Sequence, residues 1–157
     1  MRKSVYRRFS FFVVFVFVTN VVGPWVESVA AVDIDQVRCP GFIESWLVLY
    51  HTVPIITMSF AFSGAAALDP PGKEGLADMV SNLLDEGAGE LNSEEFQDAL
   101  EDISASISFK AGREYLRGSL KTLGRHRNTA FRLLKLALTN PRFDAKPIER
   151  IRAQLIA

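Results

Sequence analysis

The chain has 157 residues, of which 48% are hydrophobic and 11% aromatic, and its formal net charge is +0. This length suits one domain, and this apolar content is enough to bury a core, which excludes a disordered tail. Residues 1–31 hold four bases and one acid, so the rest of the chain is slightly acidic and shows no sign of nucleic-acid binding. One cysteine, Cys39, excludes an intramolecular disulfide, and two histidines are too few for a Cys/His metal cluster.

Residues 1–31 have the three parts of a secretory signal peptide. Basic residues between Arg2 and Arg8 precede the apolar run SFFVVFVFVTNVV, and the small residues of ESVAAV follow it. We expect cleavage after Ala30 or Ala31, and therefore a periplasmic or secreted protein. The alternative is an uncleaved membrane anchor, but the apolar run is shorter than the ~20 residues that span a bilayer, and Gly23-Pro24 interrupts it.

Residues 32–157 are expected to form the folded domain. After a polar stretch to Gly41, residues 45–51 and 54–62 predict two strands that are joined by a short turn as a hairpin. In the second strand large apolar side chains recur with the period of two that builds one apolar face: Ile56, Met58, Phe60 and Phe62. The glycines and prolines of residues 64–75 then predict a loop.

Two helices are predicted next. From Gly75 the apolar residues fall on one helical face, and this helix is expected to end at the glycines of EGAG, residues 86–89. A second helix begins at Asn92, because Glu95 lies three positions further on, as in a capping box. The predicted inner faces of these two helices are Leu76, Met79, Val80, Leu83 and Leu84 in the first, and Phe96, Leu100 and Ile103 in the second.

Two further strands and two further helices complete the pattern. Residues 105–110 and 114–123 alternate apolar with polar side chains on either side of a turn at Gly112. A Leu-rich helix at 128–138 is stopped by Asn140-Pro141, and a last helix follows Asp144. The order ββααββαα indicates the α+β class, with an antiparallel sheet and helices packed on one face.

Charge is divided along the chain. Residues 69–102 contain eleven acids and one base, whereas residues 110–152 contain twelve bases and three acids. The simpler interpretation is that these are solvated faces of helices and strands that also attract each other. The alternative is a bipolar surface that docks a partner.

Three stretches together resemble the first half-domain of the pitrilysin/insulinase family of zinc peptidases, which includes the mitochondrial processing peptidases. They are residues 46–89 (WLVLYHTVPIITMSFAFSGAAALDPPGKEGLADMVSNLLDEGAG), 96–112 (FQDALEDISASISFKAG) and 130–154 (AFRLLKLALTNPRFDAKPIERIRAQ). The resemblance depends on the order in which several features follow one another along the chain. They are a Pro-rich loop, the sequence GLA at the start of a helix, glycines at the end of that helix, and then PRFD, ER and Q. It covers nearly all of the chain after residue 31 and implies the fold of that half-domain.

In catalytic members of this family, the residues after GLA form an inverted H-x-x-E-H motif, in which two histidines bind zinc and the glutamate activates a water. Carried over by position, the first ligand is Asp78, the base is Ser81 and the second ligand is Asn82. Asparagine is a poor ligand for zinc, and serine has no group that titrates near neutrality. The resemblance therefore implies no catalytic residue, no metal ligand and no cofactor here, whereas catalytic relatives bind zinc. The third ligand of the family, a glutamate on the last helix, is either replaced within ERIRAQLIA or lies beyond it.

Two further sets of residues are candidate sites. Asp78, Asn82 and Asp85 align on one helical face, with Glu86 nearby, as oxygen ligands that suit Ca²⁺. The loop-like cage of such sites is missing, so solvation of these side chains is the simpler interpretation. The two histidines, His51 in the first turn and His126 before the third helix, lie too far apart in sequence for one helix to place them one turn apart; a catalytic His51 is the weaker alternative to a turn histidine.

These observations favour a non-catalytic homologue of a periplasmic zinc peptidase. We expect it to pair with a catalytic zinc-peptidase homologue as a hetero-oligomer and to help bind peptide substrates, with the membrane contacted only through the signal segment. One alternative is an active zinc metalloendopeptidase subunit, which needs ligands that the sequence does not contain. Another is a truncated, non-functional gene fragment, because the apolar stripe of the last helix still runs at RAQLIA.

Overall fold

The computed structural model describes residues 33–39, 43–50 and 52–156. The chain divides into two compact units, Met1–Leu49 and Tyr50–Ala157, and each is described by itself. The expected signal segment with its cleavage site, and His51, lie outside the described residues, so those expectations remain predictions. No helix among the described residues has the length and apolar character needed to cross a membrane.

The first unit contains a two-stranded antiparallel hairpin. Strand β1 (Ile34–Cys39) pairs with β2 (Ile43–Val48), so that Ile34 lies opposite Val48. The prediction of a hairpin between residues 45–51 and 54–62 is therefore wrong, and β1 lies in the polar stretch before Gly41, where no strand is predicted. The segment before β3 is held to the far end of β5 instead of closing a tight turn, because Gly124 N–H donates to the carbonyl of Pro54 at 2.9 Å.

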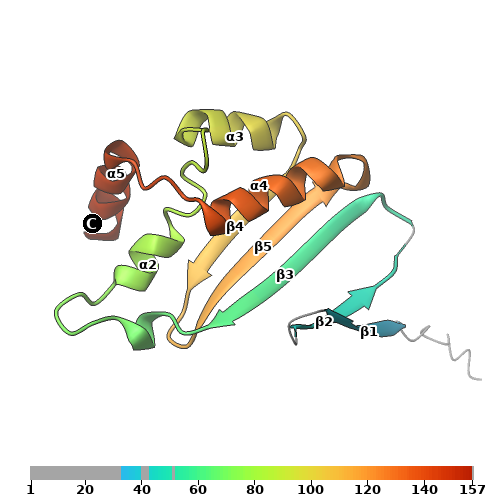
Figure 1. Ribbon diagram of the computed structural model, residues 1–157, viewed down its shortest axis with the longest axis horizontal. Helices are drawn as coiled ribbons and strands as arrows, with labels where there is room; N and C mark the ends of the chain where they lie inside the picture. Colours follow the sequence, from blue (N-terminus) through green and yellow to red (C-terminus); the bar gives the residue numbers. More distant parts are fainter. Residues whose placement is uncertain (1–32, 40–42, 51, 157) are drawn as a thin grey trace, which may run out of the picture. The chain divides into compact units, whose positions relative to one another are not determined.

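The second unit is an α+β layer, as predicted (Figure 1). Its three antiparallel strands lie in the order β3-β5-β4, with bounds Ile55–Ser63 for β3, Ser106–Ala111 for β4 and Tyr115–Leu123 for β5. All nine residues of β3 pair with β5, from Ile55 opposite Leu123 to Ser63 opposite Tyr115. Apart from the additional strand β1, the order of the elements is the predicted one.

The helices follow the predicted positions with one difference in length. They are α2 (Leu76–Ser81), α3 (Ser93–Glu101), α4 (Arg127–Thr139) and α5 (Ala145–Ile156), and two short 3-10 helices lie at Ala66–Leu68 (η1) and Gly124–His126 (η2). The capping box at Asn92 and Glu95 is present as predicted. Regular α-helix ends at Ser81 and not at the glycines, since residues 82–86 continue in turns in which Leu83 and Glu86 donate to carbonyls three residues back.

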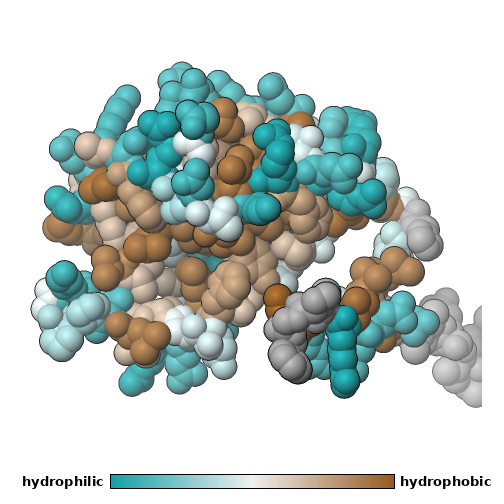
Figure 2. All heavy atoms as spheres, viewed as in Figure 1, coloured by the Kyte–Doolittle hydropathy of each residue, from teal (hydrophilic) through white to brown (hydrophobic). Residues whose placement is uncertain are grey.

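The core lies between the sheet and the helices. Phe96, Leu120 and Leu133, from α3, β5 and α4, have no exposed side-chain surface. Leu120 is one of the apolar residues that alternate with polar ones along residues 114–123, and Phe96 belongs to the predicted inner face of its helix. On the outside of the unit, Figure 2 shows hydrophilic side chains over most of the α3 side. Gly118 is required where β3 and β5 meet: a Cβ atom there would lie 2.2 Å from the ring of Phe60.

Candidate functional site

The start of α2 is held by a side chain from the preceding loop. The two carboxylate oxygens of Asp69 accept hydrogen bonds from the backbone N–H groups of Gly75 at 2.8 Å and Ala77 at 2.9 Å. Gly75 adopts a positive φ of 91°, which a side chain would disfavour. The GLA sequence thus opens α2 because Asp69 supplies acceptors for N–H groups that have no partner inside the helix.

The three positions that correspond to the zinc motif form a closed local network. The carbonyl oxygen of Asp78 accepts from the Ser81 hydroxyl at 2.8 Å, from Asn82 Nδ2 at 2.8 Å and from Asn82 N–H at 3.1 Å. The same Nδ2 also lies 3.4 Å from Oδ1 of Asp78. Ser81 is buried, with 1% of its surface exposed, whereas Asp78 and Asn82 are half-buried.

These residues do not fit a zinc ion. Asn82 presents its amide N–H₂ group, a donor, toward Asp78, and the Ser81 hydroxyl donates to a main-chain carbonyl. A zinc ligand must instead offer a lone pair, and a general base must be able to take a proton near neutral pH. Among residues 33–39, 43–50 and 52–156, no group of three or more His, Cys, Asp or Glu side chains could hold a metal ion.

The oxygen ligands considered for Ca²⁺ are drawn into other contacts. Glu86 Oε2 accepts a hydrogen bond from the Ser93 hydroxyl at 2.6 Å and forms an ion pair with Arg150 of α5. Asp85 lies beside Glu86, and its main-chain carbonyl accepts from Gln97 of α3 at 2.8 Å. Burial raises the pKa of Asp85, and the Glu86 carboxylate raises it further, while hydrogen bonding to its own backbone N–H and the charge of Arg150 oppose this. The Glu86 side chain and the main-chain carbonyl of Asp85 therefore join the segment after α2 to α3 and α5.

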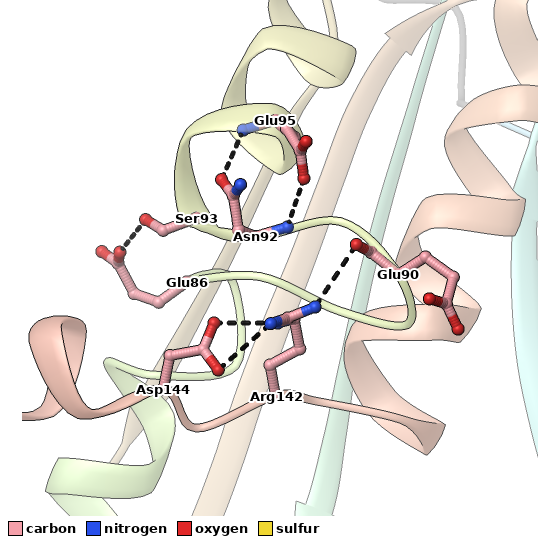
Figure 3. Close-up of polar contacts among 7 residues, drawn as sticks. All are labelled: Glu86, Glu90, Asn92, Ser93, Glu95, Arg142 and Asp144. Atoms are coloured by element: carbon pink, nitrogen blue, oxygen red, sulfur yellow. Dashed lines mark hydrogen bonds and ion pairs between the residues drawn. The ribbon is translucent and has the colours of Figure 1, made fainter.

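The glycine exit after α2 and the PRFD sequence meet in space, although they are far apart in the chain. Arg142 N–H donates to the carbonyl of Gly87 at 3.1 Å, and its guanidinium reaches the carbonyl of Glu90 at 3.3 Å. Figure 3 shows that guanidinium between Glu90 and Asp144, whose carboxylate it contacts at 2.8 Å. The same figure shows the Asn92 and Glu95 cap beside the Ser93 to Glu86 bond. We call residues 85–95 with 140–144 the turn junction.

Several of these structural residues were not found from the sequence. Asp69 has a weak signal, since an acid shortly before GLA is the side chain type that caps a helix. The ion pair between Glu86 and Arg150 has no signal in the sequence, because the two residues are 64 positions apart. His126 lies at the end of η2, where its Nε2 accepts from Arg125 Nε at 2.9 Å.

Comparison with known proteins supports the resemblance. The chain is 28% identical over 125 residues to the non-peptidase homolog YmxG of Helicobacter pylori, an alignment that covers 80% of this chain and 28% of that protein. Its fold is similar to the peptidase M16 inactive domain from Pseudomonas fluorescens (TM-score 0.72, 19% identity, 78% of this chain and 30% of that one). It is also similar to a protease from Helicobacter pylori (TM-score 0.65, 15% identity, 80% and 31%). No protein-family model matches the chain.

Peptidase M16 is the family of pitrilysin and insulinase, so the comparisons confirm that the chain resembles this family. The names of the curated relative and of the Pseudomonas domain agree with the expectation that this chain is not a peptidase. The fold alone does not decide that point, because a protease shares it. The chain spans about 30% of the length of the relatives that it matches.

Proposed function

From this likeness to non-peptidase M16 proteins, we propose that the chain is a non-catalytic, peptidase-like protein that pairs with a zinc-bearing homologue. The proposal depends on Asp78, Ser81 and Asn82, because Ser81 and Asn82 donate to the carbonyl oxygen of Asp78 where a catalytic relative needs two imidazoles and a carboxylate. The Ser81 hydroxyl and the Asn82 amide offer a hydrolytic water neither a complete set of zinc ligands nor a base. In this proposal the zinc-bearing homologue performs the chemistry, and this chain contributes surface to the substrate chamber and helps bind peptides.

The turn junction supports a structural role for the unit. It joins the segment after α2 to α3, to the α4–α5 connection and to α5 through hydrogen bonds and the Glu86 to Arg150 ion pair. We also propose that the protein is exported and acts in the periplasm or outside the cell, which rests on the signal-like residues 1–31.

Co-expression with an H-x-x-E-H homologue from the same genome tests the pairing. The expected result is a complex that survives size-exclusion chromatography, contains one zinc per pair and loses peptide cleavage on chelation. The chain alone should carry no stoichiometric zinc and cleave nothing. Cell fractionation and N-terminal sequencing test the export, with mature chains expected to begin at residue 31 or 32.

Two outcomes would overturn the proposal. Stoichiometric zinc and chelator-sensitive cleavage by the chain alone would favour the active metalloendopeptidase. Recovery of the chain only as inclusion bodies and degradation products, with no complex formed by any zinc-motif homologue, would favour the non-functional gene fragment.

A further inference from the structure

The face of the sheet opposite the buried core carries bases and hydroxyl groups but no acid. We call it the outer sheet face. On each strand this face consists of every second residue, and these residues are exposed or half-exposed. The residues of β5 that alternate with them, Gly118, Leu120 and Thr122, point to the core and are buried. Its members are Ile55, Thr57, Ser59, Ala61 and Ser63 of β3, Tyr115, Arg117, Ser119, Lys121 and Leu123 of β5, and Ser106, Ser108 and Lys110 of β4; Ile55 and Leu123 form an apolar pair at one end.

Two of the three bases face each other directly. Lys110 of β4 is the cross-strand partner of Arg117 of β5, and like charges at such positions destabilise a sheet. Neither base takes part in the ion pairs of the described residues, which join Arg142 to Asp144 and Arg150 to Glu86. The outer sheet face therefore carries a repulsion that the unit itself does not offset, as expected of a surface that meets an acidic ligand.

The groups on this face are arranged along β5 in a way that matches an extended chain. Lys121 and Arg117 lie four residues apart on one strand, roughly 13 Å at about 3.3 Å per residue. Between them lies a row of hydroxyls, in which Ser108 Oγ and Ser119 Oγ are 2.8 Å apart and Ser59 lies opposite Ser119 on the other side. The guanidinium of Arg117 lies over the ring of Tyr115, 5.9 Å from its centre, and this contact orients the base.

We propose that the outer sheet face binds acidic segments of peptides in extended conformation. Carboxylates four residues apart on such a segment would reach Lys121 at one end and the Arg117 and Lys110 pair at the other. The serine hydroxyls between them would bond to the backbone of the segment. This inference rests on the proposed function and names the class of peptide that the chain would help to bind.

A peptide fits this face better than a nucleic acid does. Single-stranded nucleic acids are bound by bases interleaved with aromatic rings on which the nucleobases stack. The outer sheet face has one aromatic residue, Tyr115, and Arg117 already lies over its ring. Its short hydroxyl side chains suit the backbone of an extended peptide.

Fluorescence anisotropy with the purified protein tests the proposal. The probe is a labelled peptide with glutamates four residues apart, and its counterpart has glutamine at those positions. We expect the glutamate peptide to bind more tightly, with an affinity that falls as salt is added. The variant K110Q/R117Q/K121Q should weaken its binding about tenfold, as three exposed charge contacts predict.

A matched variant, R127Q/R132Q/K135Q, removes three exposed charges from α4 and should leave peptide binding nearly unchanged. Thermal unfolding separates binding from folding, because loss of the Lys110 and Arg117 repulsion should leave the unfolding temperature equal or higher. Equal affinity for the two peptides, equal losses in both variants, or tighter binding of a single-stranded oligonucleotide or of anionic vesicles would each overturn the proposal. If the complex with the zinc-bearing homologue forms while the glutamate peptide fails to bind, this inference alone fails.

Discussion

Asn82 donates two hydrogen bonds to the same acceptor, the carbonyl oxygen of Asp78, through its backbone N–H at 3.1 Å and its Nδ2 at 2.8 Å. The side chain thereby repeats the bond that the helix backbone already makes. Ser81 adds a third donor to this carbonyl. A polar side chain that bonds back to its own helix turn competes with the regular ladder, which agrees with the end of α2 at Ser81.

Restoring the two imidazoles should restore a zinc site only in part. The variant D78H/N82H places two histidines one turn apart, so we expect it to bind zinc more tightly than the natural chain but weakly, since two ligands do not complete a tetrahedral site. Competition with a chromogenic chelator measures this affinity. No peptide cleavage is expected. One tightly bound zinc in the unmodified chain would contradict the account of this site.

Adding the glutamate at position 81 should destabilise the fold. Ser81 is 1% exposed, so a carboxylate at this position would lose its hydration, and only a paired cation would compensate for that loss. We expect S81E to lower the free energy of unfolding by about 1–3 kcal/mol, measured by denaturant titration, whereas S81A should lower it by about 1 kcal/mol or less. Equal stability of S81E and the natural chain would indicate that this position opens to solvent.

The turn junction depends on a glycine. Gly87 has a φ of 109°, and a Cβ atom there would lie 3.0 Å from both the carbonyl oxygen of Leu91 and the carbonyl carbon of Asn92. We expect G87A to lower the free energy of unfolding by roughly 2–4 kcal/mol. Gly72 is the matched control, because its φ of 77° is also positive but nothing lies within 4 Å of its Cβ position. G72A should cost about 1 kcal/mol, and equal losses in the two variants would contradict the contact argument.

The two ion pairs of the described residues should differ in strength. In the first pair the Glu86 side chain is 15% exposed and Arg150 is 48% exposed, whereas Arg142 and Asp144 are each 35% exposed, so the more buried carboxylate is that of Glu86. Double-mutant cycles with alanine should give a coupling energy of about 1 kcal/mol for Glu86 with Arg150 and about 0.5 kcal/mol or less for Arg142 with Asp144. A larger coupling in the second pair would show that burial does not set this order.

Asp85 should make the fold less stable as the pH rises. Burial, followed by the charge of Glu86, raises its pKa in the folded chain above the ordinary value of an aspartate. The folded state therefore holds a proton that the unfolded state has released, and stability falls as the pH rises from the unfolded pKa to the folded one. We expect D85N to raise the unfolding temperature at neutral pH, with the difference disappearing when the pH falls below the unfolded pKa.

Glu74 provides the control of opposite sign. Hydrogen bonding to its own backbone N–H and to that of Gly72 lowers the pKa of this exposed carboxylate. The stability that Glu74 contributes is present above its pKa in the unfolded chain. It is lost as the pH falls through its pKa in the folded chain. E74Q should therefore lower the unfolding temperature slightly at neutral pH. The same pH trend in D85N and E74Q would contradict the assigned causes.

Local chemistry made much of the second unit predictable. The inward and outward residues of β5 follow from a period of two, and the start of α3 follows from the Asn92 and Glu95 box, because both signals lie within a few residues of chain. The pairing of the strands was not predictable in this way. Alternation within β3 does not say which partner it takes, and the partner, β5, lies some fifty residues further on.

The sequence by itself determined which side chains occupy the motif positions, and therefore that two imidazoles and a carboxylate are missing from α2. The bonds to the Asp78 carbonyl and from Asp69 to the helix start are local, whereas only the tertiary structure decided that Glu86 meets Arg150, 64 positions away. The physical reason is the sequence separation over which each kind of interaction acts. Residue identity and periodicity act along a few positions of the chain, whereas the contacts that engage Glu86 form only after packing brings α2, α3 and α5 together.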